Sequence, residues 1–443
     1  MSQRIVIKNK IQKFSEKIIV PGDKSLSIRW VLLASIASGV SKSKNLLLSE
    51  DVLAAIKIIK KLGIKVKKKN NEFIIFGNGI NGYKVKKNLV LDAKNSGTCG
   101  RLILGLLSSY ENKIKLIGDK SLSKRDFKRI ADPLNKFGVK FELTSNKTLP
   151  LIIKGNSNLK PINYVEKRGS AQCKSAVMLA ALNANGITKI KAKKSRNHTE
   201  LLYKYLNIPI KIKKNKIYDF IEINKVKSIK PFDYNIPGDI SSSAFFIALA
   251  AMNVGSKILI KNVNINPSRI GVIQIFKKMG IRIMLKNIKN YKGEKIANIV
   301  VHGSNKIKPI NCPTKFNSGA IDEFLIIFLL AAKANGVSYF KDLEELNQKE
   351  SPRLKWGAKI LNLMGVKNKI DNNSIRIYGN PKLTINKKII IKDYLKDHRV
   401  FMTSVIAALS FGGEWVIHDK NSINTSFPDF LKIINQIKNN AKK

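Results

Sequence analysis

The chain has 443 residues, 44% of them hydrophobic, and this length predicts at least two domains. No apolar run reaches the roughly 18–20 residues of a membrane-spanning helix, and the N-terminus lacks a signal-peptide pattern, so we expect a cytoplasmic protein with no membrane partner. Three widely spaced cysteines exclude a disulfide framework and a zinc knuckle, and a formal charge of +52 raises the question of an anionic partner.

The positive charge comes from 82 Lys and Arg against 30 Asp and Glu, and it is spread along the whole chain. A nucleic-acid-binding protein is one interpretation, but such proteins gather their charge together with aromatic side chains, which make up only 7% here. Lysine recurs beside asparagine and isoleucine, so an A+T-rich coding bias is the other interpretation, and we expect no specific nucleic-acid partner. The 12 arginines are then the more informative cations. The planar guanidinium of Arg can bind a carboxylate or phosphate through two parallel hydrogen bonds, and Lys cannot.

A repeat with a period of roughly 70–85 residues fills the chain. Apolar, alanine-rich segments that end in a turn lie at 32–40, 178–187, 247–256, 328–337 and 405–413, with a looser copy at 100–109. Each precedes a short β-like run and a second helical pattern, which ends at Gly63, Gly138, Asn207, Gly280 or Gly365. Gly, or Asn in its place, suits a left-handed helix C-cap before a strand. We therefore expect about six strand–helix–strand–helix–strand units, the last completed by the N-terminal IVIKNK.

Two similar turns, VPGDKSLS (20–27) and IPGDISSSA (236–244), lie about half a chain apart and predict the crossings between two halves. We expect residues 1–20 and 237–443 to form a discontinuous domain of three units and residues 21–236 to form a second domain of three units. The hinge crossings would lie near 20–23 and 236–239, with the active site in the cleft between the domains.

Several apolar helices open with polar or charged residues, at 24–29, 95–101, 169–176, 238–244, 320–324 and 396–402. The first is predicted to begin with Ser25 or Ser27 as its cap and to close at Gly39. Free amides and the helix dipole favour an anion at such an end, and Lys24 and Arg29 add full charge. A capped, solvated helix explains any one of these starts. All six together indicate a common anion site.

Two loops add charged side chains. One, GDKSLSKRDF (118–127), contains Lys124 and Arg125, and the other, ELNQKESPRL (345–354), contains Lys349, Glu350 and Arg353. Such a cluster is more often a surface salt-bridge patch, but its place in a loop before a helix favours function. The candidate acids for proton transfer are Asp322, Glu350 and Asp397. No metal-ligand spacing, GxSxG, Walker A or GxGxxG motif occurs, so we expect no metal and no cofactor.

In this order the motifs resemble those of the 5-enolpyruvylshikimate-3-phosphate synthase family over essentially the whole chain. They read PGDKSLSIR, NSGTCGR, GDKSLSKRD, SAQCKSAVMLA, PGDISSSA, IDEF, LEELNQKESPR, DHRVFM and TSFPDF. The SAQ–KSA and LEEL–KES motifs are most similar to those of the bacterial class II enzymes, which include glyphosate-tolerant forms. The resemblance implies an α/β (α+β) fold of the EPT/RTPC-like type, a two-domain inside-out barrel of six βαβαββ units with three per domain.

The resemblance also implies a transferase of chorismate and aromatic amino acid biosynthesis. The enzyme would transfer the enolpyruvyl group of phosphoenolpyruvate to the 5-hydroxyl of shikimate 3-phosphate and release phosphate, through a non-covalent tetrahedral intermediate. Both small-molecule substrates are anions, which agrees with the capped, basic helix starts. The default oligomeric state is a monomer.

The resemblance assigns shikimate 3-phosphate to Lys24, Ser25, Arg29, Ser170, Ala171, Gln172, Arg196, Asp322 and Lys349. It assigns phosphoenolpyruvate to Lys24, Gly97, Arg125, Gln172, Arg353 and Arg399. Asp322 would take the 5-hydroxyl proton. Glu350, together with Lys24, would protonate the methylene carbon and later remove that proton.

The sequence departs from the family pattern at four positions, Ile28, Asp126, Pro352 and Thr425. Pro352 stands where Asp is usual and removes an amide donor, which puts the setting of Glu350 and Arg353 in question. The rival with the same fold, UDP-N-acetylglucosamine enolpyruvyl transferase, uses a reactive loop cysteine, and none of the three cysteines here has that context.

Overall fold

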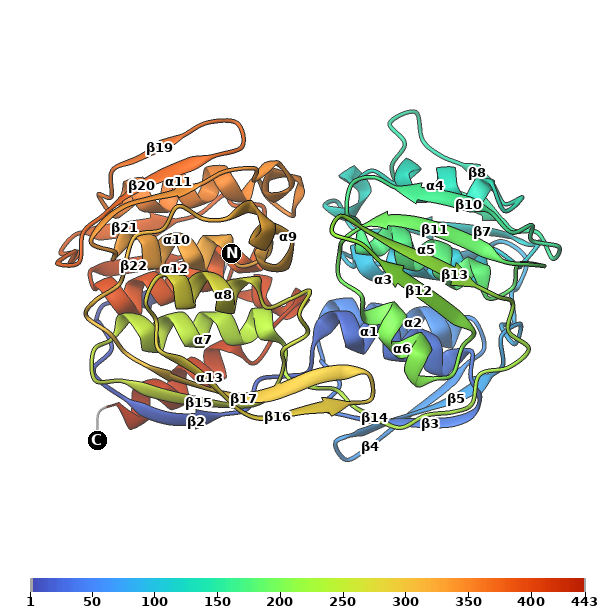
Figure 1. Ribbon diagram of the computed structural model, residues 1–443, viewed down its shortest axis with the longest axis horizontal. Helices are drawn as coiled ribbons and strands as arrows, with labels where there is room; N and C mark the ends of the chain where they lie inside the picture. Colours follow the sequence, from blue (N-terminus) through green and yellow to red (C-terminus); the bar gives the residue numbers. More distant parts are fainter. Residues whose placement is uncertain (1–2, 442–443) are drawn as a thin grey trace. The chain divides into compact units, whose positions relative to one another are not determined.

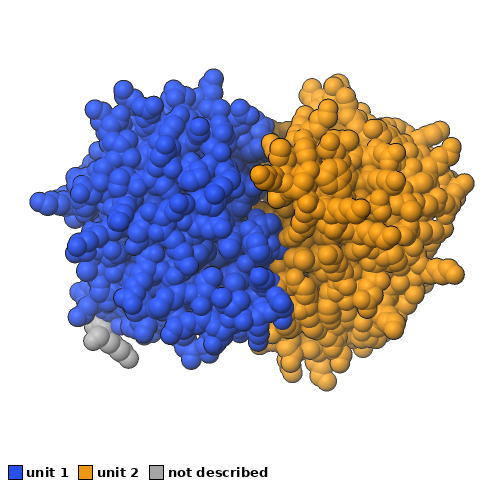
Figure 2. Space-filling view, viewed as in Figure 1, with its two compact units in different colours: residues 1–21, 237–290, 295–443 blue, residues 22–236, 291–294 orange. Residues whose placement is uncertain are grey.

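The computed structural model describes residues 3–441, and Figure 1 follows them in colour along the chain. The chain divides into two compact units, coloured separately in Figure 2. Unit 1 comprises residues 1–21, 237–290 and 295–443, and unit 2 comprises residues 22–236 and 291–294. The outermost predicted bounds, residues 1 and 443, lie outside the described residues. Within the described part of the chain, no helix has the length and apolar character that a membrane crossing requires.

The segment 291–294 departs from the predicted division, which placed it in the discontinuous domain. It belongs to unit 2 because Tyr291 packs edge-on against Tyr234 at 5.5 Å between ring centroids. The hydroxyl of Tyr291 also accepts a hydrogen bond of 2.9 Å from the backbone N–H of Asn235. Such contacts depend on tertiary packing, and the spacing of hydrophobic residues in the sequence does not predict them.

Unit 2 contains three copies of one order of elements: strand, helix, strand, helix, strand, strand. The first copy comprises α1 (Lys24–Ser35), β3 (Ser38–Lys44), α2 (Glu50–Lys61), β4 (Lys65–Lys69), β5 (Glu72–Asn78) and, as its leading strand, β14 (Tyr234–Asn235). The second comprises β6 (Leu89–Asp92), α3 (Gly97–Leu107), β7 (Lys113–Ile117), η1 (Leu122–Lys124), α4 (Lys128–Asn135), β8 (Lys140–Glu142) and β9 (Leu151–Lys154). The third comprises β10 (Asn163–Glu166), α5 (Ala171–Ala181), β11 (Thr188–Lys193), α6 (His198–Tyr205), β12 (Ile210–Lys214) and β13 (Tyr218–Ile223).

Each copy in unit 2 forms one sheet, with the strand orders β14-β3-β5-β4, β6-β7-β9-β8 and β10-β11-β13-β12. The leading strand runs parallel to the next strand, and the remaining pairs are antiparallel. In the second sheet Ile114 pairs with Leu89 on one side and with Ile153 on the other. Side chains on paired residues share a face, so Ile114 and Ile153 are both buried in the core of unit 2.

The helices that lead each copy of unit 2 are buried along nearly their whole length. Helices α3 and α5 pack closely because Gly105 has no side chain: a Cβ there would lie 2.3 Å from the carbonyl oxygen of Ala176. The second helix of the first copy, α2, keeps a polar face with its exposed lysines. Apolar helices are thereby placed inside the unit, and their N-termini carry the polar residues of the predicted site.

Unit 1 repeats the plan. Its first copy comprises β2 (Ser15–Ile18), α7 (Ile240–Met252), β15 (Lys257–Asn264), α8 (Gly271–Lys278), β16 (Ile283–Tyr291) and β17 (Glu294–His302). The second comprises η2 (Thr314–Phe316), α9 (Asn317–Ala320), α10 (Phe324–Ala332), β18 (Gly336–Phe340), η3 (Glu344–Gln348), α11 (Arg353–Leu363), β19 (Asn368–Ile370) and β20 (Ile375–Gly379). The third comprises β21 (Lys388–Ile391), α12 (His398–Phe411), β22 (Glu414–Ile417), η4 (Lys420–Thr425), α13 (Phe430–Asn440) and β1 (Ile5–Ile7).

The sheets of unit 1 have the orders β16-β17-β15-β2, β18-β20-β19 and β1-β22-β21. In the middle copy a single bridge between Asn311 and Tyr339 replaces the leading strand. Helices α7, α10 and α12 pack on one another at the centre of the unit, with the strands outside them (Figure 1). Strand β1 pairs antiparallel with β22, Ile5 opposite Ile417, so the prediction that the N-terminal segment completes the last repeat is confirmed.

The residues that end the second helices also behave as predicted. All five have positive φ angles, from 54° to 97°, and the set is Gly63, Gly138, Asn207, Gly280 and Gly365. The predicted end of the first helix is wrong. Helix α1 stops at Ser35, whose hydroxyl donates to the carbonyl of Leu32, and Gly39 lies inside β3 with φ 134°.

Candidate active site

The leading helices of unit 2 begin with side-chain caps. Asp23 accepts a hydrogen bond from the N–H of Leu26 at 2.9 Å and caps α1. The prediction that Ser25 or Ser27 is the cap is therefore wrong. Ser27 instead accepts a hydrogen bond from the N–H of Leu47. Asp competes well for this position, and its carboxylate adds a charge–dipole attraction.

Two more leading helices of unit 2 are capped by serine. Ser96 accepts from the N–H of Cys99 at the start of α3, and Ser170 accepts from the N–H of Cys173 at the start of α5. Ala171 is the first residue of α5. Each cap satisfies only one of the free amides, so the helix start keeps its affinity for anions.

Lys24 and Arg29 lie on α1. The ammonium of Lys24 pairs with the carboxylate of Asp51 at 2.9 Å, a partner from the first turn of α2 that sequence reasoning missed. Arg29 is buried, and burial lowers the pKa of its guanidinium to about 10, with the positive charge of Arg196 acting in the same direction. Arg196 itself is half-buried, two residues before α6.

A second cationic cluster in unit 2 surrounds Gly97. A Cβ on Gly97 would lie 3.0 Å from a terminal nitrogen of Arg125 and 3.1 Å from one of Arg101. The Arg125 guanidinium donates to the amide oxygen of Asn95 at 2.8 Å. The absence of a side chain at Gly97 therefore leaves two guanidiniums at the N-terminus of α3, an arrangement suited to a carboxylate or phosphate.

Gln172 makes hydrogen bonds with two residues near Gly97, Arg101 and Thr98. Its amide oxygen accepts from Arg101 at 2.6 Å, and its amide nitrogen donates to the hydroxyl of Thr98 at 3.0 Å. Burial and the positive charges of the nearby Arg129 and Arg125 together lower the pKa of Arg101 to about 10. Arg101 appeared in the sequence only as part of a motif, and its contact with Gln172 is a feature that spacing alone did not predict.

The central cation of the unit 1 residues is Arg353, whose guanidinium is surrounded by three carboxylates. Its Nε donates to Asp397 at 2.9 Å, one terminal nitrogen donates to Asp322 at 3.3 Å, and the other donates to Glu350 at 2.5 Å. Burial alone would lower the pKa of Arg353, but the charges of Asp397, Glu350 and Asp322 raise it overall. The guanidinium therefore stays charged and fixed.

Asp397 is fully buried and caps α12 by accepting from the N–H of Arg399 at 2.9 Å. Burial would raise its pKa, yet the charge and hydrogen bond of Arg353 lower it overall. An ionised carboxylate locked in this way positions its neighbours and is a poor candidate for the proton transfer that the sequence also allowed.

Asp322 and Glu323 lie in the turn before α10, since that helix begins at Phe324; the prediction that they form its first turn is wrong. Lys349 lies 3.3 Å from the Asp322 carboxylate, and Arg399 donates to the Asp322 carbonyl at 2.7 Å. Asp322 thus meets two cations through its side chain and a third through its backbone.

Pro352 does not displace Arg353. It occupies the N-cap position of α11, where its missing amide costs no helical hydrogen bond. Asn347 supplies the cap instead, because its side-chain oxygen accepts from the N–H of Leu354 at 3.1 Å. The question raised by this departure is settled for Arg353, which keeps all three carboxylate partners.

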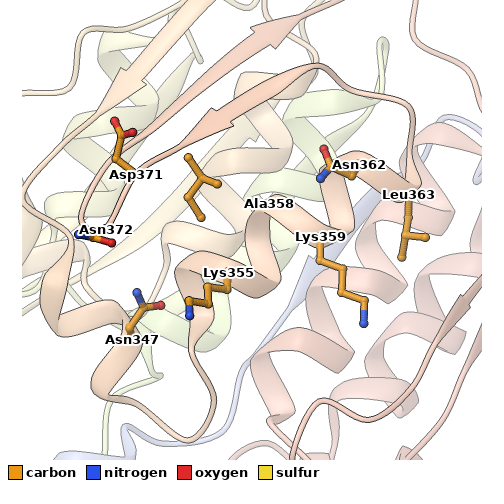
Figure 3. A pocket seen from close by; sticks show the side chains of 9 residues that line it. Asn347, Lys355, Ala358, Lys359, Asn362, Leu363, Asp371 and Asn372 are labelled. Atoms are coloured by element: carbon orange, nitrogen blue, oxygen red, sulfur yellow. The ribbon is translucent and has the colours of Figure 1, made fainter.

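An open pocket of about 1040 Å³ lies elsewhere on unit 1, along the face of α11 that carries Lys355 and Lys359 (Figure 3). None of the predicted site residues lines it. Among the described residues no group of three or more His, Cys, Asp or Glu side chains is arranged to hold a metal ion.

Six repeated units in two halves, with Arg and Lys at the helix starts, define an enolpyruvyl-transferase-like protein for anionic substrates. The enolpyruvyl transferase NikO from Streptomyces tendae has the same fold, with a TM-score of 0.77 over 99% of this chain and 98% of that chain at 14% identity. An EPSP synthase from Acinetobacter baumannii is more similar, with a TM-score of 0.87, 34% identity and 98% coverage of both chains.

The sequence comparison is equally extensive. The profile of the family "EPSP synthase (3-phosphoshikimate 1-carboxyvinyltransferase)" matches residues 8–434. The 3-phosphoshikimate 1-carboxyvinyltransferase of Ruthia magnifica is 40% identical over 419 residues, covering 94% of each chain. The chain belongs to the EPSP synthase family, transferases that move the enolpyruvyl group of phosphoenolpyruvate to shikimate 3-phosphate in aromatic biosynthesis.

Proposed function

We propose that this chain transfers the enolpyruvyl group of phosphoenolpyruvate to the 5-hydroxyl of shikimate 3-phosphate and releases phosphate. The observation that carries the proposal is the pairing of two chemistries in one chain. Unit 2 supplies cations at helix starts, and unit 1 supplies carboxylates held against Arg353. Two anions and two proton transfers require both.

Shikimate 3-phosphate would be bound by nine residues, Lys24, Ser25, Arg29, Ser170, Ala171, Gln172, Arg196, Asp322 and Lys349. Phosphoenolpyruvate would be bound by Lys24, Gly97, Arg125, Gln172, Arg353 and Arg399. In the structure, Asp322 and Glu350 occupy the terminal nitrogens of Arg353, so an incoming carboxylate would replace one of these contacts. That exchange would free a carboxylate for proton transfer when the substrate arrives.

The reaction then needs two steps. Asp322 takes the 5-hydroxyl proton as the oxygen attacks C2 of phosphoenolpyruvate, and Glu350 with Lys24 delivers a proton to the methylene carbon. The tetrahedral intermediate that results is not bonded to the protein. Return of the methyl proton and departure of phosphate restore the double bond, and the fixed guanidiniums stabilise the phosphate charge. We propose a monomer that acts in the cytoplasm without a cofactor.

The experiment is phosphate release from the purified chain, with each substrate alone and with both. Replacing the ammonium in Lys24→Met should lower kcat by about 10²–10³-fold, as loss of one stabilising donor at the reacting centre does. Lys57→Met is the matched control, because Lys57 is exposed on α2 and should leave the rate unchanged.

Release that requires both substrates and fails in Lys24→Met supports the proposal. Release with UDP-N-acetylglucosamine as acceptor, and none with shikimate 3-phosphate, would assign the chain to the rival activity. A Lys24→Met variant as active as Lys57→Met would remove Lys24 from the site.

A further inference from the structure

Arg29 is held by two hydroxyl groups that no substrate role explains. Its Nε donates to the hydroxyl of Thr199 on α6 at 2.8 Å, and one terminal nitrogen donates to the hydroxyl of Ser175 on α5 at 3.0 Å. The two hydroxyl oxygens are themselves 2.8 Å apart, within hydrogen-bond distance. Helices α1, α5 and α6 of unit 2 therefore meet in one closed triangle of hydrogen bonds.

The triangle fixes the guanidinium and leaves part of it available. The other terminal nitrogen donates to the carbonyl of Ser25 at 3.1 Å. Arg has five N–H donors, and the three contacts use one on each nitrogen, so among the described residues one donor remains on each terminal nitrogen. A pair of parallel donors is the arrangement that binds a carboxylate or phosphate through two oxygens.

Directly beside the triangle lies a buried ion pair. Lys174 precedes Ser175 on α5, and Glu200 follows Thr199 on α6. The ammonium and the carboxylate are 2.6 Å apart, with side chains 0% and 3% exposed. Within residues 3–441, the Lys174 ammonium and the two Glu200 carboxylate oxygens make no hydrogen bond, so the contact between them is ionic.

Joining two helices through a buried ion pair carries a large desolvation cost. Apolar side chains of the same volume generally stabilise a core as well or better, because two charges lose their hydration on burial. What the ion pair adds is direction. It joins α5 and α6 at neighbouring positions to the hydroxyl contact, so the two helices cannot turn against each other without separating opposite charges in a dry environment.

We propose that Thr199 and Ser175, braced by the Lys174–Glu200 ion pair, are positioning residues that aim Arg29 at shikimate 3-phosphate. This inference rests on the proposed function for the identity of the ligand. Its geometric part, the fixing of the guanidinium, does not. A small displacement of a binding group changes binding strongly. Loss of the triangle should therefore weaken the binding of shikimate 3-phosphate, the ligand of Arg29, and leave the binding of phosphoenolpyruvate unchanged.

The test compares two threonines that are both buried in unit 2. Thr199→Val removes the acceptor of Arg29 Nε while keeping the volume, and Thr188→Val removes a buried hydroxyl that has no hydrogen-bond partner within residues 3–441. For Thr199→Val we expect the Kd and the KM of shikimate 3-phosphate to rise about 10-fold or more. The KM of phosphoenolpyruvate should stay within about twofold, and Thr188→Val should change neither constant.

A second variant examines the brace. The double change Lys174→Met with Glu200→Leu keeps the core filled, so the protein should fold, and a purely structural ion pair would leave both KM values unchanged. We expect a selective rise in the KM of shikimate 3-phosphate in this variant as well. A folded Thr199→Val protein with a wild-type Kd would overturn the proposal, whatever its melting temperature.

A direct readout separates this proposal from the proposed function. The side-chain Nε–H of Arg29, assigned by its loss in Arg29→Lys, should give a slowly exchanging NMR signal in the wild type and in Thr188→Val. It should exchange rapidly in Thr199→Val. If the wild type binds no shikimate 3-phosphate, the proposed function fails and this signal still decides whether the triangle fixes Arg29. A signal equally protected in Thr199→Val refutes the positioning role.

Discussion

Asp397→Asn removes one charge from the centre of the unit 1 carboxylate cluster without changing its volume. The two carboxylate oxygens of Asp397 are used differently: Oδ2 accepts from Arg353 Nε and from the hydroxyl of Ser351, and Oδ1 accepts from the N–H of Arg399 and from a terminal nitrogen of Arg353. An amide nitrogen in place of Oδ2 would face the Nε–H of Arg353, so donor would meet donor.

The magnitude follows from the contacts that are lost. Two hydrogen bonds to a charged acceptor, at about 1.5–3 kcal/mol each, give about 3–6 kcal/mol. Breaking a buried ion pair on one side costs about 3–5 kcal/mol, and we expect a loss of that size in the free energy of unfolding of unit 1. Two matched changes bound the result. Ser351→Ala removes one hydroxyl contact and should cost about 1 kcal/mol. Glu414→Gln breaks only a solvent-exposed pair with Lys388 of unit 1, at 3.1 Å, and should be close to wild type.

The assay is urea unfolding followed by tryptophan fluorescence. Trp30 lies in unit 2, whereas Trp356 and Trp415 lie in unit 1, so a Trp30→Phe background reports on unit 1 alone. Because two units need not unfold together, the separate signal is required before a free energy is assigned. A loss below about 1 kcal/mol in Asp397→Asn would refute the reasoning, since it would mean that Arg353 does not depend on this partner.

The sign of the pH dependence follows from the pKa of Asp397, which Arg353 lowers in the folded state. A carboxyl group with a depressed pKa stabilises fully above its unfolded value, near 3.9, and that stability is lost as the pH falls through the folded value. In the Asn variant the acid-induced loss of unit 1 stability should therefore be smaller.

Two further predictions concern unit 2 and the cysteines. Gly97→Ala should raise the KM of phosphoenolpyruvate about 10-fold in steady-state phosphate release, because its Cβ pushes on Arg125 and Arg101; an unchanged KM would show that neither guanidinium contacts this substrate. All three cysteines are free and buried, and burial raises the pKa of Cys312 to about 11 and that of Cys99 above its usual range. The folded protein should therefore react slowly with a disulfide reagent at pH 8, and unfolding should expose three thiols; rapid reaction of the native protein would contradict this.

The repeat could be predicted because its signals are local. An apolar run fixes a buried helix, and a residue with positive φ marks the end of the next helix, so Gly63 and its four counterparts could be identified from the sequence. The place of the N-terminal IVIKNK in the last repeat followed from the incomplete last copy, whereas its antiparallel pairing with β22 came from the structure. Each inference needed only the period of the pattern and the chemistry of one position.

The contacts within the site were harder to predict from the sequence. The cap of α1 came from Asp23 and not from Ser25 or Ser27, because several acceptors stood within one turn and the backbone path chose among them. The pairing of Lys24 with Asp51 depends on how two helices pack. Sequence spacing does not encode that geometry.

The pairing of β1 with β22 also orders the events of synthesis. Unit 2 is almost one continuous stretch, residues 22–236, and its sheets need few partners from later in the chain. The strands before it, β1 and β2, pair with β22 and β15, so their hydrogen-bond partners do not exist until more of the chain has been translated. Strands β1 and β2 are thus translated before unit 2 but find their partners only after it, and unit 1 completes its final sheet only when β22 has been made.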